Sequence, residues 1–178
     1  MCDRVILLND VMLIDKTSTC CFTGHRPAKM SWRTNEDDYR CLELKERIFN
    51  AVDAVYKIGV RHYISGMAIG CDFYFCDAVI LLRSQKPGVT LEAAVPWEGQ
   101  AESWSSKLRD RYYRLMADCD YETVVQTDYS FDCMVRRNRY MVDKSNYLIA
   151  AYNGSTGGTL HTMNYAKSQG IQVIELPF

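Results

Sequence analysis

Short, continuous apolar runs alternate with helix-compatible segments along this chain of 178 residues. Runs without polar interruption are typical of strands that are covered on both faces, as in a parallel sheet with helices above and below it. We therefore expect an α/β fold, a three-layer arrangement around a mostly parallel, doubly wound sheet. The predicted strands are 19–22, 62–65, 91–95, 122–126, 147–151 and 171–176.

The segments between these strands have helical spacing. The first helix begins near Thr34 or Asn35, each of which has an acidic residue three positions later, and Gly59 ends it. The remaining helices are predicted at 72–85, at 100–115, at 130–145 and from the last glycine loop to residue 168. Within 100–115, Trp104 recurs with other apolar residues every three or four positions, which favours a place in the core over a base-stacking role.

The length of the chain and its hydrophobic content of 48% suit one domain, which we place at 19–178 after an N-terminal extension at 1–18. Two apolar runs around Asn9-Asp10 favour an accessory hairpin at 5–14. This extension lacks the basic start and the unbroken apolar core of a secretory signal, and no segment reaches membrane-spanning length. The extension and the aromatic-rich helices favour a homodimer.

The charge is nearly balanced, with 21 basic and 22 acidic residues, which argues against nucleic acid and anionic membranes as partners. The eight cysteines form no CxxC pair and the three histidines are dispersed, so we expect no metal site and no required cofactor. Without a secretory signal, the cysteines are expected to be reduced thiols of a cytoplasmic protein. We expect His62 at the edge of a strand, without a chemical role.

Three loops of unusual composition follow predicted strands, at 23–27, 66–72 and 153–159. Right-handed crossovers place such loops along one edge of a parallel sheet, and ligands bind at that edge where the strand order reverses. Glycines in the loop 153–159 allow a ligand to approach the backbone, and the N–H groups that open the next helix attract anions. We therefore expect a phosphate or a carboxylate there, although an ordinary glycine-rich turn would explain the same residues.

Charged side chains accompany these loops. Asp72 falls in the first turn of a helix, where it either serves as a helix cap or contacts a ligand. Arg137 lies beside Asn138 and between Arg136 and Arg139, and guanidinium groups are planar donors suited to phosphate or carboxylate. Neither a GxGxxG dinucleotide motif nor a P-loop occurs, so a nucleotide would have to be held in another way.

Five motifs occur in a fixed order from residue 20 to residue 178. They are Thr23-Gly24-His25-Arg26-Pro27, then 65–72 (SGMAIGCD), then Pro96 with Gln100 and Trp104, then Arg137-Asn138 with 141–143 (MVD), and finally Gly154 with 157–159 (GGT) and Tyr165-Ala166. Together they resemble the YpsA-like family of the SLOG superfamily, which is named for DNA-processing protein A and the LOG proteins. The resemblance implies a Rossmann-like sheet whose loops bind a nucleotide or a nucleotide-derived ligand of the ADP-ribose or NAD type. It also implies a binding or regulatory protein in a bacterial or phage-related setting.

One position departs from a related branch of hydrolases. The resemblance implies that LOG phosphoribohydrolases carry a catalytic glutamate three residues after a Gly-Thr pair, and Thr162 stands there after Gly158-Thr159. Threonine cannot supply a carboxylate acid or stabilise an oxocarbenium-like centre by charge. This lowers the case for the same hydrolysis, although Asp72 or Asp143 could in principle substitute from another loop.

We therefore expect a sensor, regulator or sequestering protein that binds a nucleotide ligand, rather than an enzyme. Two alternatives stay open: an N-glycosidic hydrolase that uses Asp72, and a DNA-binding protein that uses its arginines. In the leading hypothesis, the backbone of 157–159 binds a phosphate, Arg26 or Arg137 neutralises it, and Asp72 accepts a ribose hydroxyl. The expected ligand-binding residues are Thr23, Gly24, His25, Arg26, Gly66, Met67, Ala68, Gly70, Asp72, Gln100, Trp104, Arg137, Asn138, Asn153, Gly154, Gly157, Gly158 and Thr159.

Overall fold

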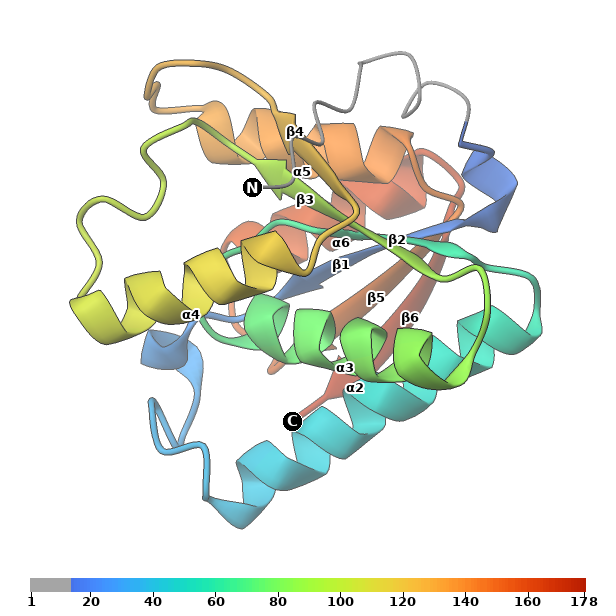
Figure 1. Cartoon of the computed structure of the whole chain (residues 1–178), viewed down its shortest axis with the longest axis horizontal. Coiled ribbons are helices and arrows are strands. Elements are labelled where there is room, and N and C mark those ends of the chain that lie inside the picture. Colours follow the sequence, from blue (N-terminus) through green and yellow to red (C-terminus); the bar gives the residue numbers. More distant parts are fainter. Residues whose placement is uncertain (1–13) are drawn as a thin grey trace.

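The computed structural model describes residues 14–178, so the hairpin expected at 5–14 falls almost entirely outside the described residues. Six strands alternate with helices in the order that the sequence predicts (Figure 1). The strands are β1 (Thr19–Gly24), β2 (His62–Ser65), β3 (Thr90–Val95), β4 (Tyr121–Val124), β5 (Tyr147–Tyr152) and β6 (Gln172–Pro177). The α-helices are α2 (Tyr39–Lys57), α3 (Cys71–Gln85), α4 (Ser106–Ala117), α5 (Cys133–Asp143) and α6 (Gly158–Ser168), and two short 3-10 helices are η1 (Lys16–Ser18) and η2 (Pro27–Lys29).

The six strands form one parallel sheet in the order β4-β3-β2-β1-β5-β6. From β1 the chain builds outward through β2, β3 and β4, and then it returns to place β5 on the other side of β1. Cys20 of β1 accordingly aligns with Tyr63 on one side and with Tyr147 on the other. The strand order therefore reverses between β1 and β5. This confirms the doubly wound sheet that the alternation of elements predicts and the Rossmann-like fold that the resemblance implies.

Helices cover both faces of the sheet (Figure 1). Successive residues of β1 point to opposite faces, so Cys20 and Phe22 belong to the core under α2, α3 and α4, whereas Cys21 belongs to the core under α5 and α6. The first core is the larger and holds the stacked pair Phe22 and Phe75, whose ring centroids are 4.7 Å apart. Among the described helices, none is long and apolar enough to cross a bilayer.

Three helices begin later than the sequence predicts, and one of them is α5, which begins at Cys133 rather than at residue 130. Helix α2 starts at Tyr39, and its N-cap Asp38 accepts a hydrogen bond from the backbone N–H of Arg40. The start expected near Thr34 or Asn35 is therefore wrong. Helix α4 starts at Ser106, and residues 98–103 form turns. The spacing misleads there because Gln100 and Trp104 are covered by packing of the turns rather than by one helical face.

His62 lies at the start of a strand, as expected, but its side chain has polar partners that the sequence does not predict. It begins β2, an interior strand, and only 2% of its surface is exposed. Its Nε2 lies 2.8 Å from Oε2 of Glu92 on the neighbouring strand, and its Nδ1 lies 2.9 Å from Oγ1 of Thr90. The reason is topological: β3 extends the sheet beyond β2 and supplies both polar partners to this side chain.

Candidate functional site

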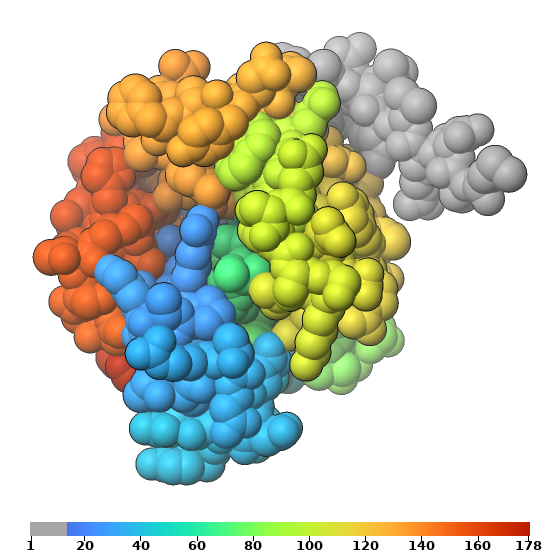
Figure 2. Space-filling model, turned by 90° about the vertical axis from the view of Figure 1, so that its left-hand side faces the viewer, coloured from blue at the N-terminus to red at the C-terminus, as the bar shows by residue number. Residues whose placement is uncertain are grey.

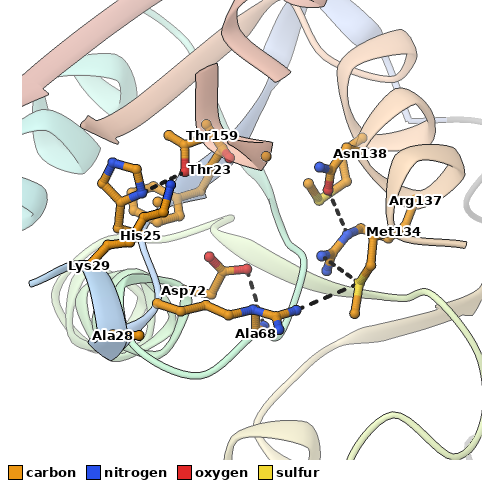
Figure 3. Close-up of a pocket in the computed structure, with 15 residues that line it drawn as sticks. Thr23, His25, Ala28, Lys29, Ala68, Asp72, Met134, Arg137, Asn138 and Thr159 are labelled. Atoms are coloured by element: carbon orange, nitrogen blue, oxygen red, sulfur yellow. Dashed lines mark hydrogen bonds between the residues drawn. The ribbon is translucent and has the colours of Figure 1, made fainter. Parts of the chain in front are cut away.

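A pocket of about 390 Å³ lies at the carboxyl edge of the sheet, where the strand order reverses. Figure 2 views this edge face on, and the hollow lies near its centre, beside the blue segment that follows β1. The end of β1 and its loop, the segment that begins α3, one side of α5 and the first residues of α6 all contribute to it (Figure 3). The lining residues are Phe22, Thr23, Gly24, His25, Arg26, Ala28, Lys29, Ala68, Asp72, Met134, Arg137, Asn138, Met141, Gly158 and Thr159.

Two glycines set the starts of the helices that face this pocket. Gly70 precedes α3 with a φ of 99°, and Gly157 precedes α6 with a φ of 137°, and few residues with a side chain adopt such backbone angles. No side chain of the described residues caps either helix. The first N–H groups of a helix have no partner inside the helix, so at α6, where Gly158 and Thr159 line the pocket, they are available to an anion.

Asp72 is the one carboxylate that the described part of the chain contributes to the pocket lining. It is 5% exposed, and its Oδ2 accepts a hydrogen bond from the backbone N–H of Ala68 at 3.2 Å. Burial raises the pKa of this carboxyl above its usual value, against the opposing effect of Arg137, the Ala68 amide and Arg26. Its bond to Ala68 holds the loop before α3 in place and does not cap the helix, so the capping role that the sequence allows is not observed.

Arg137 is buried at 5% exposure, and its donors are used inside the protein. Its Nη1 donates to the carbonyl of Gly66, and its Nε donates to Oδ1 of Asn138 at 2.8 Å. Burial lowers the pKa of Arg137, and the nearby Asp72 carboxylate opposes that shift. Arg137 therefore contributes positive charge to the pocket wall, while its N–H groups donate to acceptors of the protein itself.

Two exposed cations stand closer to solvent. Arg26 makes one weak polar contact, from Nη2 to the sulfur of Met134 at 3.9 Å, among the described residues. Lys29 donates to the carbonyl of Thr156 and so lies against the loop that precedes α6. With Arg137, these side chains make three cations against the one carboxylate of Asp72, so the lining favours an anionic ligand.

His25 lies between the pocket and the aromatic residues behind it. Its Nδ1 is 3.3 Å from Oγ1 of Thr159, and its ring lies near those of Tyr152 and Phe178, at centroid distances of 5.6 Å and 5.9 Å. Burial, together with the charge of Lys29, lowers the pKa of His25. A neutral imidazole here orients the Thr159 hydroxyl without adding a fourth positive charge.

Ten of the expected ligand-binding residues meet in this pocket. They are Thr23, Gly24, His25, Arg26, Ala68, Asp72, Arg137, Asn138, Gly158 and Thr159. The other eight, which lie outside the lining, are Gly66, Met67, Gly70, Gln100, Trp104, Asn153, Gly154 and Gly157. Whether the ten bind a ligand stays a prediction, but their meeting is the geometry that the three loops were expected to make.

The eight residues outside the lining have structural roles: they shape or bind the backbone near the pocket, or they pack against the core. The Arg137 guanidinium occupies the space that a side chain at Gly66 would need. The carbonyl of Met67 accepts a hydrogen bond from Nε2 of Gln100 at 2.9 Å. The rings of Phe73 and Tyr112 contact Trp104 edge-on, which agrees with the core position favoured by its spacing. Asn153, in the loop with Gly154 and Gly157, donates to the carbonyl of Lys29 at 2.7 Å.

Sequence reasoning missed Lys29, Met134 and the apolar wall residues Phe22, Ala28 and Met141. Lys29 follows the loop 23–27 by two residues, and that proximity of a cation to a binding loop is the signal that could have found it. Met134 precedes Arg137 by three residues and Asn138 by four, so helical spacing places it on the same side of α5. The described residues hold no cluster of His, Cys, Asp or Glu that could bind a metal ion.

Thr162, the residue at the position of the hydrolase glutamate, is 1% exposed and lies outside the pocket lining. Its Oγ1 donates to the carbonyl of Gly158 and accepts from Nδ2 of Asn138, both at 2.9 Å.

The seven cysteines of the described part are free, and all except Cys119 are buried. Burial raises the pKa of Cys21 to about 12, so this thiol is poorly suited to nucleophilic chemistry.

Solved structures share this fold. DNA processing protein A of Streptococcus pneumoniae matches 95% of the chain with a TM-score of 0.63 and 16% identity, and the chain spans about half of that protein, 52%. DNA processing protein A of Helicobacter pylori, described for its single-stranded DNA binding mode, matches 92% of the chain with a TM-score of 0.57 and 12% identity, over 66% of its own length. At these identities the likeness concerns the fold.

Sequence relatives come from bacteria and a prophage. The SPbeta prophage-derived protein YoqJ of Bacillus subtilis is 29% identical over 139 residues, which are 71% of this chain and 81% of that protein. A UPF0398 protein of Bacillus velezensis is 22% identical over 139 residues, which are 77% of this chain and 76% of that protein. The family model YpsA, described as "YspA SLOG family", matches residues 20–173. The chain therefore belongs to the YpsA family of SLOG proteins.

Proposed function

We propose that this protein binds a nucleotide or a nucleotide-derived ligand of the ADP-ribose or NAD type, and that it acts as a sensor, regulator or sequestering protein. The observation that carries the proposal is the pocket at the reversal of strand order, into which the uncapped start of α6 opens among three cations. Its volume of about 390 Å³ lies within the range of small-molecule sites.

The proposed phosphate position is the start of α6. The N–H groups of Gly158 and Thr159 would donate to phosphate oxygens, as helix N-termini do in other phosphate sites. Arg26 is the side chain best able to neutralise the phosphate, since its guanidinium is exposed and weakly engaged. Arg137 would contribute through its charge, because its donors are already bound to Gly66 and Asn138.

Asp72 would bind the ribose. One of its oxygens is held by the N–H of Ala68, and the other makes no hydrogen bond within the described part of the chain. A carboxylate oxygen in this situation is a strong acceptor for a ribose hydroxyl. Phosphate at α6 and sugar at Asp72 would together place the ligand across the ends of β1, α3 and α6.

A matched pair of substitutions at Gly158 tests the proposal. A Cβ added at Gly158 would meet no described atom within 4 Å, so both Gly158→Ala and Gly158→Asp are expected to fold, and an acidic residue suits the first turn of a helix. The carboxylate of the second variant would repel a phosphate bound there. Titration calorimetry with ADP-ribose, NAD and AMP is expected to show binding to the wild type and to Gly158→Ala, and a loss of more than about tenfold in Gly158→Asp. Binding of none of these ligands, or equal binding to both variants, would contradict the proposal.

The enzymatic alternative has one observation in its favour. The pKa of Asp72 is raised by burial, as is required of a carboxyl that donates a proton to a leaving group. Most glycosidases use two carboxyl groups, however, and the described pocket lining supplies one. Chromatography after incubation with nucleoside monophosphates and NAD separates the two functions: release of free base would favour hydrolysis, and unchanged substrate favours binding.

The DNA-binding alternative is weakened by the contacts of the α5 arginines. Arg136 pairs with Asp132 at 2.7 Å, and the guanidinium of Arg139 lies 5.4 Å from the ring centroid of Tyr165. Tyr165 in turn donates to Asp143 at 2.8 Å, so Arg139 and Asp143 both contact this tyrosine. Steeply salt-dependent binding of single-stranded DNA would favour this alternative over a nucleotide ligand.

A further inference from the structure

A chain of hydrogen bonds links the loop before α3 to the first turn of α6. It runs from the carbonyl of Gly66 through Arg137, Asn138 and Thr162 to the carbonyl of Gly158. Arg137 Nε lies 2.8 Å from Asn138 Oδ1, and Asn138 Nδ2 lies 2.9 Å from Thr162 Oγ1. Thr162 Oγ1 lies 2.9 Å from the carbonyl oxygen of Gly158. Helix α5, which carries Arg137 and Asn138, therefore stands between two of the loops that form the pocket.

The direction of every bond in this chain is fixed by chemistry. A guanidinium group can only donate, so the oxygen of Asn138 must face Arg137 and its NH₂ group must face Thr162. The Thr162 hydroxyl accepts from that NH₂ group, and its own proton goes to the carbonyl of Gly158. Because Arg137 and Thr162 are buried, water is a poor substitute for a missing member of the chain.

We propose that Asn138 and Thr162 are positioning residues, which hold the first turn of α6 at the place where it meets the ligand's phosphate. This inference rests on the function proposed above. Gly157 gives the loop before α6 wide conformational freedom, and no side chain of the described residues caps the helix. The chain that ends at the Gly158 carbonyl restrains this turn through its acceptor and leaves its N–H groups available to the ligand, and Arg137 extends the chain to the loop that carries Ala68.

Substitutions at Thr162 test this role. Thr162→Val keeps the shape of the side chain and removes the hydroxyl, whereas Thr162→Ser keeps the hydroxyl. In calorimetry with ADP-ribose, the valine variant is expected to bind about five- to tenfold more weakly than the wild type, and the serine variant to bind within about twofold of it. A lower melting temperature of Thr162→Val with undiminished affinity would assign Thr162 a purely structural role and would overturn the proposal.

A measurement without ligand separates this proposal from the proposed function. The backbone N–H of His161 donates to the carbonyl of Gly157 at 3.0 Å and so reports on the first turn of α6. Its hydrogen exchange is expected to be at least about tenfold faster in Thr162→Val than in the wild type and Thr162→Ser. If the wild type binds no nucleotide, the proposed function fails, and exchange at His161 alone decides this inference: faster exchange supports it, and unchanged exchange overturns it.

Discussion

At the scale of single residues, Asp72 combines an unfavourable environment with a favourable position. Its pKa is raised mainly by burial, so the folded protein binds a proton at this carboxyl more readily than the unfolded chain does. A group of this kind contributes most to stability below its unfolded pKa, and that contribution is lost as the pH rises through its folded pKa. At a pH above its folded pKa, the charged Asp72 is therefore a cost to folding that binding of a ligand would offset.

This cost can be measured with Asp72→Asn, since an amide oxygen can still accept from the Ala68 N–H. We expect urea unfolding at pH 7 to show a free energy of unfolding that is higher than that of the wild type. The same variant is expected to bind ADP-ribose at least about tenfold more weakly, because it loses the charged acceptor for the ribose. A variant that is less stable than the wild type, or that binds equally well, would contradict the role assigned to Asp72.

At the scale of the elements, α5 is fixed to the sheet by polar contacts as well as by its apolar side chains. Tyr140 of α5 donates to Oε1 of Glu92 at 2.7 Å, and the other oxygen of Glu92 faces Nε2 of His62. Burial raises the pKa of Glu92, but the bonds with His62 and Tyr140 outweigh it, and the pKa lies below its ordinary value of 4.5. Helix α5 also carries Arg137 and Asn138, so these contacts help to fix the position of two residues of the pocket lining.

The lowered pKa of Glu92 fixes the direction of a pH effect. Its contribution to stability is present above 4.5 and is lost as the pH falls through the lower folded value. We expect Glu92→Gln to lower the free energy of unfolding by about 1–3 kcal/mol at pH 7 and to narrow that difference toward pH 3. Urea unfolding at pH 7, 5, 4 and 3 checks this, with the exposed Glu43→Gln as the control. A difference from the wild type that stays constant over this range would refute the role of the Glu92 charge.

The order of the elements could be predicted from the sequence because apolar runs, glycines and helical spacing are local signals. The start of α4 could not, since Trp104 has helical spacing but owes its burial to Phe73 and Tyr112. The meeting of the three loops followed from the parallel topology. The commitment of Arg137 to Gly66 and the pairing of His62 with Glu92 could not be predicted, because each partner is chosen by packing across elements distant in the sequence.

At the scale of the whole molecule, the pocket depends on the reversal of strand order between β1 and β5. There the chain brings together the end of β1, the starts of α3 and α6, and one side of α5, with more positive than negative charge in the lining. The large apolar core under α2, α3 and α4 lies beneath this edge, while the pocket combines apolar walls with charged side chains and is open to solvent at Arg26 and Lys29. We therefore expect a site that is formed before its ligand arrives.

The most direct test is a nuclear magnetic resonance titration of the uniformly ¹⁵N-labelled 20.5 kDa chain with ADP-ribose. We predict that the largest saturable changes in backbone amide shifts fall on Gly158, Thr159 and Ala68, and that adenosine, which has no phosphate, leaves the first two nearly unchanged. Largest changes at the opposite edge of the sheet, or no saturable change at any amide at millimolar ADP-ribose, would contradict a phosphate site at the start of α6.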